Sequence, residues 1–65
     1  MRPQTSRKNK EMLTQDLAGE NDAIARYIVR VKQAEELNLY HLAQQLRTNL
    51  AVEQEHAMDL EQALG

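Results

Sequence analysis

Three ionisable side chains occupy positions that helical spacing assigns to apolar faces: Glu20, Glu53 and His56. Burying a charged carboxylate without a partner is very unfavourable, so each of these groups needs compensation. Because Glu53 and His56 are separated by one helical turn, one metal ion can contact both. The chain has no cysteine, so a metal site must be built from Asp, Glu and His. Such ligands suit non-haem iron or manganese, with zinc as a substitute.

A first helix, over about residues 12–37, is predicted to position Glu20. Apolar residues and this one acid advance by threes and fours along a single face, the spacing of a helix that packs on another helix. That stripe consists of Leu13, Leu17, Glu20, Ile24, Tyr27, Val31 and Ala34.

A second helix, over about residues 39–64, is predicted to carry Glu53 and His56. Its stripe consists of Leu42, Leu46, Leu50, Glu53, Ala57, Leu60 and Leu64. The adjoining core positions are Ala43, Asn49, His56 and Ala63. Asn38 lies between the two helices and tolerates the left-handed conformation of a turn. Glu20 precedes this turn by about as many residues as Glu53 follows it, so an antiparallel hairpin brings both to a similar height.

The ends of the chain differ in charge. Residues 1–11 are predicted to form a flexible basic tail, since Arg2, Arg7, Lys8 and Lys10 outnumber Glu11. No aromatic residue accompanies these charges, and a nucleic-acid partner is not expected. The chain has neither an apolar run long enough for a membrane span nor a secretory signal, and a cytoplasmic location is expected.

A chain of 65 residues is short for a stable core without disulfides, metal or a partner. A lone hairpin over residues 12–65 would leave one side of each stripe facing water. The predicted fold is therefore all-α, a two-helix antiparallel hairpin that dimerises into a four-helix bundle. A twofold axis through the centre would gather two copies of Glu20, Glu53 and His56, which is a di-metal site.

Two segments carry a resemblance to a known superfamily. LAGENDAIARY (residues 17–27) and EQEHAMDL (residues 53–60) resemble the N-terminal half of bacterioferritins, and also encapsulated ferritins and rubrerythrins. The similarity covers about residues 12–65. These ferritin-like proteins have a Glu on the first helix of each half, a Tyr seven residues later, and Glu-x-x-His-Ala on the second. Many relatives have an acid where this chain has Val52.

The resemblance implies a role for each matching residue. Glu20 and His56 would be terminal ligands of one iron, Glu53 from both chains would bridge the pair, and all three would be catalytic. Tyr27 would donate a hydrogen bond to a ligand carboxylate or act as a local redox partner; a plain core aromatic is the other interpretation. The implied activity is that of a ferroxidase, which oxidises Fe(II) to Fe(III).

The implied assembly is a homodimer or a larger homo-oligomer. Iron storage would additionally need a cage or an enclosing protein shell, such as an encapsulin-type compartment.

Two other functions fit the same residues. A metal-free helical dimerisation module would use the two stripes for packing alone. A rubrerythrin-like peroxidase fragment is the second alternative, although a complete enzyme of that kind normally has a rubredoxin-type centre with cysteines.

Overall fold

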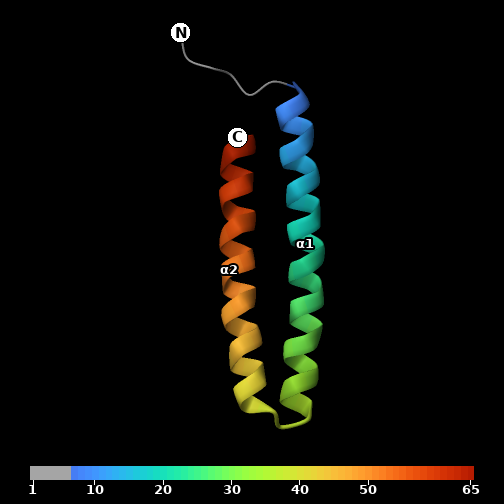
Figure 1. The fold of residues 1–65 in the computed structure, drawn as a ribbon, viewed down its shortest axis with the longest axis vertical. Coiled ribbons are helices and arrows are strands. Elements are labelled where there is room, and N and C mark those ends of the chain that lie inside the picture. The colour runs from blue at the N-terminus through green and yellow to red at the C-terminus, as the bar shows by residue number, and fades with distance from the viewer. Residues whose placement is uncertain (1–6) are drawn as a thin grey trace.

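The computed structural model describes residues 7–65, which form two antiparallel helices joined by a short turn (Figure 1). Helix α1 spans Arg7–Glu36 and helix α2 spans Tyr40–Leu64. The prediction of an all-α hairpin is confirmed for this part of the chain. Neither helix has a segment that is long and apolar enough to cross a membrane within the described residues.

Helix α1 begins earlier than the sequence analysis predicted. It starts at Arg7 instead of near Met12, so the C-terminal part of the predicted tail is helical. This segment contains no Pro or Gly and is rich in Lys, Arg and Glu, which are good helix formers. The Thr14 hydroxyl also donates to the Lys10 carbonyl at 2.8 Å, within the first turns. The rest of the predicted tail, residues 1–6, lies outside the described residues.

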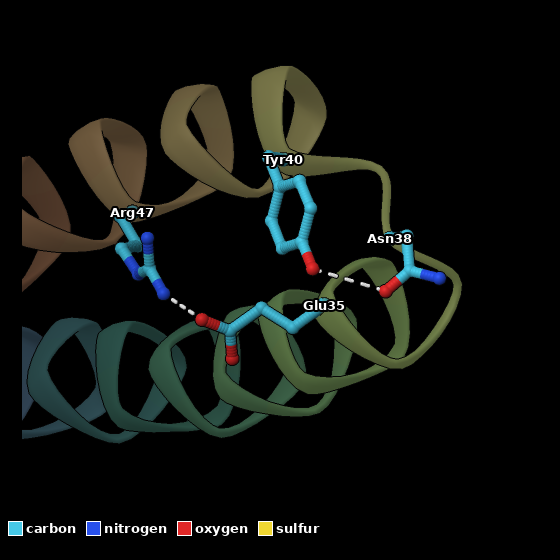
Figure 2. A network of polar contacts seen from close by, with 4 residues as sticks. All are labelled: Glu35, Asn38, Tyr40 and Arg47. Carbon is cyan, nitrogen blue, oxygen red and sulfur yellow. Dashed lines mark hydrogen bonds and ion pairs between the residues drawn. The ribbon is translucent and has the colours of Figure 1, made fainter.

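The turn is a hydrogen-bonded helix stop centred on Asn38. This residue has a φ of 62°, in the left-handed region that ends many helices. Its N–H donates to the Glu35 carbonyl at 2.9 Å, and the Leu39 N–H donates to the Ala34 carbonyl at 2.8 Å. These two bonds are those of a Schellman motif, which satisfies the last carbonyls of α1. The Tyr40 hydroxyl donates to Asn38 Oδ1 at 3.0 Å (Figure 2).

An ion pair joins the two helices close to this turn. Arg47 of α2 contacts Glu35 of α1 (Figure 2), and the two side chains are 50% and 38% exposed. A pair this exposed contributes at most about 1 kcal/mol. It links Glu35, near the end of α1, to Arg47, about two turns into α2.

The core of the hairpin is thin. Its buried residues are Val31, Ala34, Ala43 and Ala57. The predicted stripe of α1 is buried or half-buried throughout, and that of α2 is too except for Leu42, which is 44% exposed. Of the adjoining positions, Ala43 is buried, whereas Asn49, His56 and Ala63 are exposed. The two helices thus enclose mainly small side chains.

The conformation of Asn38 gives a direct test of the turn. We expect Asn38→Ala to be less stable than Asn38→Gly by about 1 kcal/mol, since a Cβ is strained in the left-handed region. Both variants lose the hydrogen bond from Tyr40, so the difference between them isolates the backbone effect. Urea denaturation at one protein concentration measures it. Equal stability of the two variants would contradict the turn geometry.

Candidate metal centre

Three side chains from the two helices meet near the middle of the hairpin. Glu20 comes from α1, and Glu53 and His56 come from α2. Each offers one ligand atom, and the three atoms lie within 4.8 Å of one another. The structure therefore brings together all the residues that the sequence analysis proposed as ligands. Their role as ligands stays a prediction.

The spacing of the three groups suits an ion better than direct hydrogen bonds. His56 Nδ1 lies 3.9 Å from Glu20 Oε1 and 3.9 Å from Glu53 Oε2. These distances exceed the usual limit of about 3.2 Å for such a hydrogen bond. Two ligand atoms bound at about 2.1 Å to one metal ion lie about 3–4 Å apart. The gap between imidazole and carboxylates is of that size.

Glu20 is the least exposed member of the cluster. Its side chain is 24% exposed, but its Oε2 atom is buried and has no hydrogen-bond partner among the described residues. Ionised carboxylates only accept hydrogen bonds, so Glu20 and Glu53 can bond to each other only when one of them holds a proton. A hydrogen bond with Glu53, together with burial and the Glu53 charge, raises the pKa of Glu20. The cluster is therefore short of positive charge.

The cluster is open on one side of the hairpin. His56 is 54% exposed, and a shallow groove runs beside it. Its lining consists of Gln15, Asp16, Gly19, Glu20, His56, Asp59 and Leu60. Three protein ligands leave part of the coordination shell of a six-coordinate ion free. Water, a substrate or a second chain can reach that free part through the groove.

No protein-family model, curated protein or solved structure matches this chain. The resemblance to ferritin-like proteins therefore rests on residues 17–27 and 53–60.

Tyr27 lies on the same face of α1 as Glu20, two turns further along. Its side chain is half-buried, as a stripe residue should be. Within the described hairpin, its hydroxyl makes no hydrogen bond with another residue. A hydrogen bond from Tyr27 to a ligand carboxylate therefore stays a prediction. In the single hairpin, the half-buried side chain contributes to packing.

Two further acids lie beside the cluster, and neither belongs to the predicted ligand set. Asp16 precedes Glu20 by four residues on α1, and Asp59 follows His56 by three on α2, so both line the groove. The charge of Asp16 adds to the rise in the pKa of Glu20. The spacing of Asp16 from Glu20 and of Asp59 from His56 places each acid one helical turn from a predicted ligand, and this could be seen in the sequence. Without the positions of both helices, however, a solvated face was the simpler interpretation.

The raised pKa of Glu20 predicts how the stability of the metal-free protein depends on pH. Protonated Glu20 contributes stability that is present below its ordinary pKa of 4.5 and is lost as pH rises through the higher folded value. Glu20→Gln keeps a hydrogen-bond donor at every pH. We therefore expect the melting temperature of Glu20→Gln, relative to wild type, to rise as pH increases from 4.5 to 7.

The control is Asp22→Asn, which removes an exposed charge from the same helix. Thermal denaturation in the presence of a chelator measures all three proteins. A difference between Glu20→Gln and wild type that is independent of pH would contradict the shared proton.

Proposed function

We propose that this chain is a ferritin-like iron-binding protein with a di-metal site between two copies that oxidises Fe(II) to Fe(III). One observation carries the proposal: Glu20, Glu53 and His56 converge around a gap, with an oxygen of Glu20 buried and unpartnered. A cation in the gap would satisfy that oxygen and remove the repulsion between the carboxylates.

The donor set fits iron. Two carboxylates and one imidazole per chain are ligands that bind iron and manganese well and also accept zinc. Negatively charged oxygen ligands stabilise Fe(III) more than Fe(II), which makes oxidation of the bound ion more favourable. No thiolate is present to favour softer metals. Glu20 and His56 would hold one ion, and Glu53 would lie between that ion and the next.

A second copy would complete the site. The open groove beside His56 and the thin core both leave surface that another hairpin could cover. Leu37, Leu39 and Leu42 are 68%, 47% and 44% exposed, which is unusual for neighbouring leucines. Two chains would supply four carboxylates and two imidazoles, enough for two ions in a four-helix bundle.

The reaction that we propose takes two Fe(II) ions as substrate. Together they supply two electrons, which reduce dioxygen to hydrogen peroxide with uptake of two protons, or hydrogen peroxide to water. The carboxylates hold both ions close enough to act as a pair. Tyr27 is the proposed donor to a ligand carboxylate. Storage of the Fe(III) product would need an enclosing shell.

The competing function is a metal-free helical dimerisation module. A proton shared between Glu20 and Glu53 would satisfy the cluster in part without any metal, which is the observation in its favour. The two functions differ in what metal does to the protein, and the next two predictions separate them.

Metal should stabilise the protein. We expect Fe(II) under anaerobic conditions, Mn(II) or Zn(II) to raise the melting temperature of the metal-free protein, because only the folded site gathers the ligands. At a hundred times the dissociation constant, the gain in unfolding free energy is about 2.7 kcal/mol. Elemental analysis should find one metal ion per chain. An unchanged melting temperature with saturating metal would favour the metal-free module.

Glu53 should matter for oxidation and not for folding. Glu53→Ala removes one ligand from each chain and one of two repelling carboxylates, so the metal-free protein should be as stable as wild type or more stable. The rate of Fe(II) oxidation should fall by more than about 100-fold. Replacing even a residue that only hydrogen-bonds to a metal ligand lowers metal affinity or activity by about 10- to 100-fold.

The matched control is Glu55→Ala, which removes an exposed acid from the same helix and should leave the oxidation rate unchanged. Absorbance of Fe(III) and thermal denaturation are the two measurements. Loss of metal-free stability with oxidation intact would identify Glu53 as a structural residue.

A further inference from the structure

Of the described residues that line the groove beside His56, Gly19 alone lacks a side chain. It directly precedes Glu20, inside the helix Arg7–Glu36. Relative to alanine, glycine in a helix interior lowers the folding equilibrium constant roughly fivefold. Gly19 does not have the positive φ that favours glycine. The conformation of the helix therefore gives no reason for a glycine at this position.

Packing within the hairpin gives no reason either. A Cβ placed on Gly19 would meet no atom of the described residues within 4 Å, apart from its chain neighbours and the backbone of its own helix turns. Gly65 also has open space around it, but its φ of 89° at the end of α2 accounts for a glycine there. The missing side chain of Gly19 is therefore useful only to something that enters the groove from outside the hairpin.

The groove is the accessible side of the metal cluster. Glu20 and His56 both line it, so an ion held by these two residues would border the groove at the height of Gly19. Three protein ligands leave part of the coordination shell of such an ion free. A small molecule that binds in the free part would then lie in the groove, beside Gly19.

We propose that Gly19 is a specificity-determining position of the site, because its missing side chain leaves room for the small-molecule oxidant next to Glu20 and His56. This inference rests on the proposed function, and it adds the residue that limits the size of the ligand. Dioxygen and hydrogen peroxide, with two heavy atoms each, fit such a space. A larger side chain at position 19 would take up the same space.

The charge of the groove favours a small ligand over a helix of a second chain as the occupant. The centre of a protein interface is depleted of charged residues. Around Gly19, however, the groove is lined by the ionisable side chains of Asp16, Glu20, His56 and Asp59. A second chain can cover the groove and still leave this polar space for water and the oxidant.

Gly19→Leu tests the proposal, and Ala18→Leu is its matched control. Ala18 is the preceding residue, is exposed and does not line the groove. Both changes place a leucine on the same stretch of α1, but only one places it in the groove. Gly19→Ala is a smaller change. It should raise the melting temperature of the metal-free protein by about 4–8 °C, because it removes the destabilising effect of glycine in a helix.

Azide and fluoride are the probes, each titrated into the Fe(III)-loaded protein and followed by absorbance. In Gly19→Leu, azide, which has three atoms, should bind about tenfold more weakly or worse, since the added side chain overpacks its space. Fluoride, a single atom, should bind as in the wild type. Fe(II) oxidation should slow, whereas the rise in melting temperature with Mn(II) should remain. Ala18→Leu should match the wild type in every measurement.

Each outcome decides the role of Gly19. Unchanged azide binding and oxidation in Gly19→Leu, with Mn(II) still stabilising the wild type, would overturn this role alone. No effect of Mn(II) on the wild type would overturn the metal site as well. If Gly19→Leu sediments as a smaller species than the wild type, the space belongs to a contact between chains and the proposal is wrong. If Gly19→Leu does not fold, equal azide affinity in Gly19→Ala and the wild type overturns it.

Discussion

The hairpin is organised around two carboxylates that it holds close together. Glu20 and Glu53 come from different helices and share a half-buried space, and the nearby acids Asp16 and Asp59 add further negative charge. Their mutual repulsion must be offset by a proton or a cation, and the buried oxygen of Glu20 shows that the protein itself offers little help. The site is thus electrostatically incomplete, and its pairing, metal affinity and pH response all depend on what completes it.

Much of the fold follows from the sequence because its signals are local. The stripes containing Val31 and Ala57 predict which faces are buried, and Asn38 predicts the turn, because each depends on spacing or on one backbone conformation. The predicted start of α1 was wrong. The basic composition of residues 7–11 suggested a tail, but the high helix propensity of these residues favours a helix.

The site was harder to predict than the fold. Its three central residues could be proposed because each is a polar residue on an apolar stripe or beside one. The groove could not, since it depends on where Asp16 of one helix lies relative to Asp59 of the other. The exposure of Leu42 and His56 also escaped the pattern, because a stripe shows which residues can be buried and not whether one hairpin suffices to bury them.

The Schellman turn has a consequence for how fast the site can form. It ends α1 and starts α2 within three residues, so the first contacts between the helices, such as those around Ala34 and Ala43, close a very short loop. Contacts between the helices can then form in order, starting at the turn and moving away from it. The contact between Glu20 and Glu53 forms in this sequence, so it does not require two distant segments to meet independently. Helical bundles, whose contacts are similarly local, fold in microseconds to milliseconds. Pairing with a second chain depends on protein concentration, so in dilute protein it would be the slower step.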